Sequence, residues 1–298
     1  MKPNLFIVGA MKSGTTSAYD FLIGFPGVYG ALRKEPHYFS EDLRKHPHAL
    51  MLNTINAIKG AEYISKERSY NKLFSEIPAE ARYVIDASTS YLYSERAAEN
   101  IKKYSPEAKI VILLRDPVQR AWSEYLMNRA IGSEVMSFRR ALESEHNQLR
   151  KDKVFLLKRY LRAGHYATQI ERFLQNFPKE NVFVSTVDHP DKPLQKVLED
   201  LSHFLELKYY INRNIVHENR AKLSKYPLIN SAIYFSGLKA LASHFSPPWV
   251  RRQAQIHYYS ASNSRIPEQQ ARWLASYFAP HNSRLTKMGI DIDHWSSP

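Results

Sequence analysis

The sequence contains no cysteine among its 298 residues. Disulfide bonds, thiolate zinc sites and cysteine nucleophiles are therefore excluded. It also contains no run of roughly 18 or more apolar residues, so it predicts no membrane-spanning helix. The apolar run at residues 5–8 is too short for the core of a signal peptide. These absences favour a cytoplasmic protein whose core is held together without covalent cross-links.

Acidic residues are scarce relative to basic ones. The sequence has 29 aspartates and glutamates and 42 lysines and arginines, which gives a formal net charge of +13. A positive field favours anionic partners such as nucleic acids, anionic lipids, phosphorylated cofactors or acidic glycans. A basic surface without a specific partner is the alternative. The 44% of hydrophobic residues can form a sizeable core, and we expect a single domain over residues 1–298.

Short apolar segments alternate with amphipathic ones along the chain. Unbroken apolar runs, typical of strands buried on both faces, predict strands at 5–8, 82–86, 109–115 and 181–186. Apolar residues at helical spacing predict helices at 16–25, from 117 onward, and at 138–151, 166–177, 193–205 and 267–278. Buried strands that alternate with helices predict an α/β fold with a central, mostly parallel sheet flanked by helices.

Residues 224–262 differ in character from the rest of the chain. They are rich in aromatic residues and include the pair Pro247-Pro248. We predict a variable helical segment here. It either covers the main core or lies at an acceptor groove or a membrane surface.

The loop after the first predicted strand, residues 9–16 with the sequence GAMKSGTT, has the glycine spacing of a phosphate-binding loop. Its glycines let backbone N–H groups converge on a phosphate without a Cβ in the way. The following helix adds the positive end of its dipole. Lys12 supplies a charge, and Ser13, Thr15 and Thr16 supply hydroxyl donors. The nucleoside-triphosphatase signature has its lysine after the second glycine, whereas this lysine lies inside the loop, which weighs against ATP.

A second group of polar residues follows the predicted strand at 109–115. Arg115 lies at the carboxyl end of this strand, where open α/β sheets bind their ligands, and its guanidinium can hold a second phosphate. Ser123 follows about two helical turns further on and can add a hydroxyl. The alternatives are a salt bridge from Arg115 to Asp86 or Asp116, and a magnesium site at Asp116.

The third group of polar side chains lies at 33–39, where the sequence is RKEPHYF. A carboxylate, an imidazole and two basic side chains crowd this segment, and Pro36 disfavours helix before it. Glu35 or His37 can act as a general base. Taken alone, the segment also fits a surface turn.

The three motifs occur together and in this order, and together they resemble the sulfotransferase family that uses 3′-phosphoadenosine 5′-phosphosulfate (PAPS). The resemblance is to its heparan-sulfate-type branch and related bacterial enzymes. Residues 164–166 and 277–285 also resemble the family, more weakly. The resemblance implies a P-loop-like fold with a five-stranded parallel sheet between helices. It also implies transfer of a sulfuryl group from PAPS to a hydroxyl or amine of a carbohydrate or glycolipid, which leaves adenosine 3′,5′-bisphosphate.

The resemblance assigns roles to individual residues. Glu35 matches the catalytic base, His37 lies beside the acceptor, and Lys12 stabilises the leaving group. Arg220 takes the place of a basic element that grips the 3′-phosphate in family members. The implied cofactor-binding residues are Lys12, Ser13, Gly14, Thr15, Thr16, Arg115, Ser123 and Arg220, the last three for the 3′-phosphate. No metal is expected.

Two positions depart from the family pattern. The family often has an aspartate three residues after the histidine, where this chain has Ser40. Many animal members have Glu-Lys-Ser-Pro where this chain has Asp-Ala-Ser-Thr at 86–89. Ala87 thereby replaces a lysine that lies near donor and acceptor. This weighs against recognition of a sulfated glycan of the animal type.

Two other functions compete with this interpretation. A P-loop kinase or hydrolase would use ATP and magnesium, but the lysine position and the arginine before Asp116 argue against it. A non-catalytic module that binds nucleic acid or membranes explains the charge but not three motifs at strand ends. We therefore expect a small-molecule, glycan or lipid acceptor and no nucleic acid, and we leave peripheral membrane contact and oligomeric state open.

Overall fold

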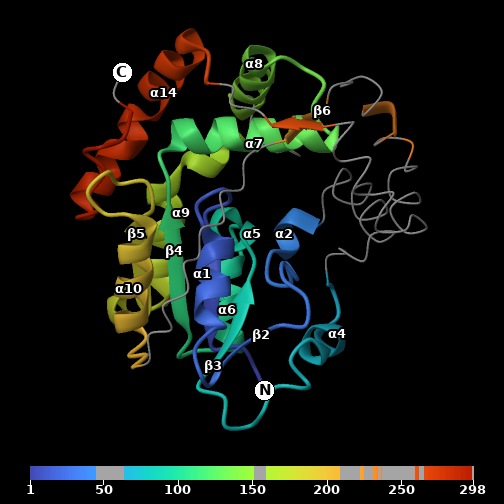
Figure 1. Cartoon of the computed structure of the whole chain (residues 1–298), viewed down its shortest axis with the longest axis vertical. Helices are drawn as coiled ribbons and strands as arrows, with labels where there is room; N and C mark the ends of the chain where they lie inside the picture. Colours follow the sequence, from blue (N-terminus) through green and yellow to red (C-terminus); the bar gives the residue numbers. More distant parts are fainter. Residues whose placement is uncertain are drawn as a thin grey trace.

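The computed structural model describes residues 1–44, 64–150, 159–208, 222–224, 231–233, 236, 259–261 and 265–296. These residues form a five-stranded sheet between helices and a second sheet of two short strands (Figure 1). None of the helices in these ranges is long and apolar enough to cross a membrane. The expected α/β architecture is confirmed.

The large sheet has the order β2-β3-β1-β4-β5, and every neighbouring pair is parallel. Its strands are β1 (Leu5–Gly9), β2 (Val28–Gly30), β3 (Tyr83–Ala87), β4 (Lys109–Leu114) and β5 (Val182–Thr186). All residues of β1 are buried, and β3 and β4 are buried beyond their first residue. This explains their unbroken apolar sequences, because both faces of the sheet are covered. Strand β2 was not predicted, since three residues at a sheet edge carry no apolar run.

The predicted helices are present, and most of their ends lie within three residues of the predicted ones. The helices are α1 (Thr15–Leu22), α2 (Glu41–Arg44), α4 (Glu67–Lys72), α5 (Ser90–Tyr93), α6 (Ala97–Tyr104), α7 (Pro117–Ile131), α8 (Phe138–Leu149), α9 (Tyr166–Asn176), α10 (Leu194–Phe204) and α14 (Glu268–Lys287). Helices α2, α4, α5 and α6 were not predicted. Helix α14 runs nine residues past its predicted end and contains Pro280, because Asn282 and Leu285 beyond the proline are buried.

Alternate side chains of β1 enter two different cores. Leu5 and Ile7 pack with α1 and α10, whereas Phe6 and Val8 pack with α5, α6 and α9 on the other face. A third cluster joins α7, α8 and α14. Helix α7 starts three residues after β4 ends, and Figure 1 shows it across that end of the sheet. The carboxyl ends of the strands therefore face this third layer.

The segment 224–262 was predicted to be helical, and most of it lies outside the described residues. Its two ends were not predicted correctly. Lys222–Ser224 (β6) and Tyr259–Ala261 (β7) pair as antiparallel strands, and β6 lies against α7. The two ends of this long segment are therefore joined beside the helix that carries Ser123.

Candidate functional site

The three predicted motifs meet at the carboxyl ends of three neighbouring strands. Central strand β1 runs into the glycine-containing loop, β3 lies on one side of it, and β4 lies on the other. Arg115 directly follows β4, and Glu35 is bound to the end of β3, as described below. The sheet order thus brings together residues that are up to about a hundred positions apart in the sequence.

The loop after β1 turns sharply before α1 begins. Lys12 and Gly14 both have positive φ angles, 69° and 75°. Gly14 is the N-cap of α1 and provides no side-chain cap, so the start of the helix can offer N–H groups to an anion. Gly9 serves packing instead, because a Cβ there would lie 2.6 Å from Cβ of Leu92 in α5. The loop has the geometry expected of a phosphate site.

The hydroxyl groups of the loop differ in exposure. Ser13 and Thr15 are buried, whereas Thr16 is exposed. The Ser13 hydroxyl has no hydrogen-bond partner in the described residues, so it is free to donate to a ligand. The Tyr166 hydroxyl donates a hydrogen bond to the Arg115 carbonyl oxygen at 3.0 Å. Tyr166 therefore ties the start of α9 to the end of β4. Tyr166 was not predicted as a site residue, although it belongs to the weaker family match at 164–166.

Lys12 and Arg115 form a pair of neighbouring cations. Burial lowers the pKa of Lys12, and the positive charge of Arg115 lowers it further. Within the described ranges, neither side chain forms an ion pair with a carboxylate. The alternative of a salt bridge from Arg115 to Asp86 or Asp116 is not observed. Glu124 acts on Lys12 only as a nearby charge that opposes these shifts in pKa. Two adjacent cations that form no ion pair with a described carboxylate are suited to a ligand with more than one negative group.

Asp116 has a structural role. Its carboxylate accepts hydrogen bonds from the Val118 N–H at 2.9 Å, the Ser296 N–H at 3.2 Å and the Ser296 hydroxyl at 2.5 Å. It caps α7 and fixes residue 296 near the C-terminus. These bonds occupy the oxygens that a magnesium ion would need, so they weigh against the magnesium alternative.

Glu35 is fixed to the end of β3 by both its backbone and its side chain. Its N–H donates to the Ala87 carbonyl at 3.0 Å. Its carboxylate accepts from the Thr89 N–H at 2.9 Å and from the Thr89 hydroxyl at 3.2 Å. Burial raises the pKa of Glu35 to about 7, while the bonds from Thr89 and the charge of Lys34 oppose this shift. The side chain is still 37% exposed, so a substrate can reach the recessed carboxyl group.

His37 lies beside Glu35, with its Nε2 at 3.5 Å from the Glu35 Oε2. Its Nδ1 lies 2.7 Å from the Ser90 hydroxyl, which lies 3.0 Å from the Ser40 hydroxyl. Burial, and then the charge of Arg33, lower the pKa of His37 to about 4. Ser40 adds no negative charge that would raise this pKa. Near neutral pH the pair therefore consists of a titrating carboxyl group and a neutral imidazole.

Asp86 supports this pair from the core. Its buried carboxylate accepts hydrogen bonds from the hydroxyls of Tyr70 at 2.7 Å, Tyr91 at 2.8 Å and Ser88 at 2.8 Å. The Ser88 hydroxyl in turn accepts from the His37 N–H at 3.2 Å. Burial raises the pKa of Asp86 to about 6, and the three hydroxyl donors oppose that shift. Asp86 is a positioning residue that the sequence did not reveal.

Two predicted residues lack structural support. Ser123 is half-buried on α7, eight positions after Arg115, and the structure gives it no interaction with the other site residues. Arg220 lies outside the described residues. Their roles toward a 3′-phosphate stay predictions.

Residues 2–247 match the family model described as "Sulfotransferase domain". The chain is 25% identical to heparan sulfate glucosamine 3-O-sulfotransferase 6 of Homo sapiens over 96% of its own length and 71% of that protein. It is 28% identical to bifunctional heparan sulfate N-deacetylase/N-sulfotransferase 1 of Caenorhabditis briggsae over 69% of its own length and only 23% of that protein.

A solved structure supports the same grouping. The crystal structure of a sulfotransferase from Alicyclobacillus acidocaldarius aligns with a TM-score of 0.70 and 26% identity, and the alignment covers 99% of both chains. By contrast, the chain spans less than a quarter of the length of the bifunctional relative. The likeness thus extends over nearly all of the solved chain and over only part of the larger animal protein.

Proposed function

The chain belongs to the sulfotransferase domain family, and we propose that it transfers a sulfuryl group from PAPS to a hydroxyl or amine group of an acceptor. One observation carries the proposal. Lys12, Arg115 and Glu35 lie at the carboxyl ends of three adjacent parallel strands, with β1 in the centre. This arrangement joins an anion site to a group that can accept a proton.

The donor fits the two neighbouring cations. The loop N–H groups and Lys12 bind the 5′-phosphosulfate, with Ser13, Gly14, Thr15 and Thr16 around it. Arg115 binds the 3′-phosphate, aided by Ser123 and Arg220. Neither Lys12 nor Arg115 has a carboxylate partner in the described residues, so both charges are available to such a ligand. Guanidinium groups suit phosphate because they can donate two parallel hydrogen bonds.

The reaction is an in-line transfer. The acceptor oxygen or nitrogen forms a bond to sulfur while the bond from sulfur to the bridging phosphate oxygen breaks. Negative charge develops on the bridging oxygen, where Lys12 and the loop N–H groups stabilise it. Donors that are already fixed need little reorganisation during the reaction. Adenosine 3′,5′-bisphosphate is the second product.

Glu35 takes the proton from the acceptor. A carboxylate with a pKa of about 7 binds a proton more strongly than an ordinary one and is still largely ionised just above neutral pH. His37 is neutral there and positions the acceptor through its imidazole. The Thr89 bonds hold the carboxylate in place while its outer surface stays exposed.

The acceptor we propose is a carbohydrate or a glycolipid. The support is the likeness to enzymes whose names refer to heparan sulfate and the net charge of +13. Ala87 stands in place of the lysine of many animal members. We therefore favour an acceptor with few sulfate groups of its own.

A P-loop kinase or hydrolase is not favoured. The lysine lies inside the loop, and Asp116 is occupied as a helix cap. Thermal unfolding with adenosine 3′,5′-bisphosphate and with ATP–magnesium separates the two functions, because a ligand of the folded state raises the Tm. We expect the bisphosphate to raise the Tm. A rise with ATP–magnesium alone would overturn the proposal.

Lys12→Ala tests the loop directly. We expect it to lower the transfer of radiolabelled sulfate from PAPS by roughly 100- to 1000-fold, the usual loss when one such donor is removed. The matched control is Lys66→Ala, which removes an exposed lysine at the start of α4. Full turnover of Lys12→Ala would contradict the role of the loop. The same assay on oligosaccharides, glycolipids and phenols identifies the acceptor, and transfer to phenols alone would contradict a carbohydrate.

A further inference from the structure

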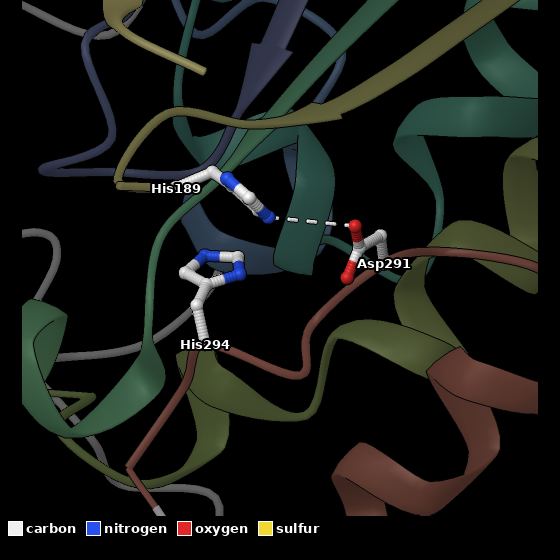
Figure 2. Close-up of side chains that lie close together, drawn as sticks. All are labelled: His189, Asp291 and His294. Atoms are coloured by element: carbon white, nitrogen blue, oxygen red, sulfur yellow. Dashed lines mark ion pairs between the residues drawn. The ribbon is translucent and has the colours of Figure 1, made fainter. Parts of the chain in front are cut away.

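Three potential metal ligands lie together outside the site described above. His189 follows β5, and Asp291 and His294 lie in the segment after α14 (Figure 2). One ligand atom from each residue lies within 4.8 Å of the other two. The cluster thus joins the end of the sheet to a segment about a hundred residues later in the sequence.

His294 has the least exposed side chain of the three, at 7%. Its Nε2 lies 3.3 Å from the Asp188 Oδ1. Its Nδ1 is buried and has no hydrogen-bond partner in the described structure. Figure 2 shows one ring nitrogen of His294 turned toward His189 and Asp291. A buried polar atom without a partner is unfavourable, so this nitrogen indicates a missing ligand.

Asp188 holds the His294 ring in the tautomer that can bind a metal ion. Its Oδ1 also accepts from the Trp295 Nε1 at 3.2 Å, and its Oδ2 accepts from the Asp116 N–H at 2.8 Å. A carboxylate beside Nε2 favours the proton on that nitrogen and leaves a lone pair on Nδ1. Metal-binding histidines are commonly held in this way by a second carboxylate.

We propose that His189, Asp291 and His294 bind a divalent transition-metal ion of the zinc type. Zinc prefers imidazole nitrogen and carboxylate oxygen in a tetrahedral arrangement, with ligand atoms about 3.4 Å apart at the usual bond lengths. The His189 Nε2 and the Asp291 Oδ2 are already 3.5 Å apart. Two imidazoles exclude magnesium and calcium, which prefer oxygen ligands. A water molecule completes the four positions.

Binding requires local rearrangement. The ligand atoms, which lie within 4.8 Å of one another, draw closer around the ion, and the His189 ring changes its tautomer. The His189 Nδ1 accepts a hydrogen bond from the Asp191 N–H at 3.0 Å, which places the ring proton on Nε2. Coordination through Nε2 moves this proton to Nδ1, so the Asp191 N–H turns to water. Asp191 is exposed, which allows this. The rearrangement makes binding weaker than at a fully preformed site.

The ion would fasten the segment after α14 to the loop after β5. Asp188 connects this point to Asp116, which directly follows Arg115. The ion has no part in the sulfuryl transfer step. Its role is to hold the segment 291–295 against the carboxyl ends of β4 and β5.

The test uses the full chain, without a histidine tag and stripped of metal with EDTA. Calorimetric titration with zinc chloride is expected to show one binding site, and zinc is expected to raise the Tm. His294→Ala and Asp291→Asn should each weaken binding more than tenfold. The matched control, His203→Ala, removes an exposed histidine on α10 and should bind as the wild type does.

Asp291→Asn keeps the experiment decisive if His294→Ala fails to fold, because the Asp291 side chain is 67% exposed. Magnesium chloride should give no heat of binding. Unchanged zinc affinity in Asp291→Asn, or no saturable zinc binding by the wild type, would overturn the proposal.

Discussion

At the scale of single residues, Glu35 determines how activity should vary with pH. A general base must be ionised, and burial raises the pKa of Glu35 to about 7. We therefore expect kcat/KM to rise with pH through a midpoint near neutrality, measured from roughly pH 5 to pH 9. His37, with a pKa of about 4, is neutral across that range. Glu35→Gln should lose the pH-dependent rise and about 100- to 10,000-fold of the rate. A flat wild-type profile would contradict this assignment.

Thr89 allows the pKa of Glu35 to be shifted on purpose. Its hydroxyl donates to the carboxylate and so stabilises the ionised form. Thr89→Val removes this donor at nearly constant shape, so the midpoint of the pH profile should move to higher pH. Thr89→Ser keeps a hydroxyl and is the control. If both variants keep the wild-type midpoint, the hydroxyl does not tune the base.

The sequence revealed some site residues and not others, for a physical reason. Lys12 and Arg115 follow unbroken apolar runs, so their place at strand ends could be predicted from local pattern. Thr89 and Tyr166 could not, because their role depends on contacts with residues about fifty positions away in the sequence. Such contacts depend on the order of the strands, and local pattern does not give that order.

At the scale of helices, two arginine–glutamate pairs of the same spacing should contribute very differently to the free energy of unfolding. Arg120 and Glu124 on α7 lie 2.7 Å apart and are almost fully buried, whereas Arg139 and Glu143 on α8 lie 2.7 Å apart in solvent. We expect Arg120→Met to lower the free energy of unfolding by about 3–5 kcal/mol, because it leaves a buried carboxylate unpaired. Arg139→Met should lower it by less than about 1 kcal/mol.

Denaturation in urea measures both changes. Arg120 also donates to the backbone carbonyls of Arg159 and Tyr160, so it joins α7 to the residues that precede α9. The double variant Arg120→Met with Glu124→Gln should regain part of the loss, since the unpaired charge is gone. Equal effects of Arg120→Met and Arg139→Met would show that burial does not strengthen the pair.

The helices also show where pattern alone fails. Helix α14 continues through Pro280 because the contacts of Phe278 and Leu285 with the core outweigh the local preference for a break. Helices α4 and α5 are four to six residues long, too short for a helical repeat to stand out. Long elements with a buried face could be predicted, and short ones fixed by their surroundings could not.

At the scale of the whole molecule, the net charge of +13 should be visible in the salt dependence of donor binding. Charges act over about 10 Å at 0.1 M salt and about 3 Å at 1 M. We expect the KM for PAPS to rise with potassium chloride while kcat changes little. Sucrose is the uncharged control. A KM that does not depend on salt would show that only the contacts inside the site attract the donor.

The central position of β1 has a consequence for the nascent chain. This strand leaves the ribosome before its partners β3 and β4, which end at Ala87 and Leu114. At about 5–20 residues per second, the apolar strand and its phosphate loop wait roughly 5–20 s for both neighbours. During that time at least one edge of the strand is unpaired, which is a hazard for aggregation. The strand at the centre of the proposed site is therefore the one to which a chaperone has the longest opportunity to bind.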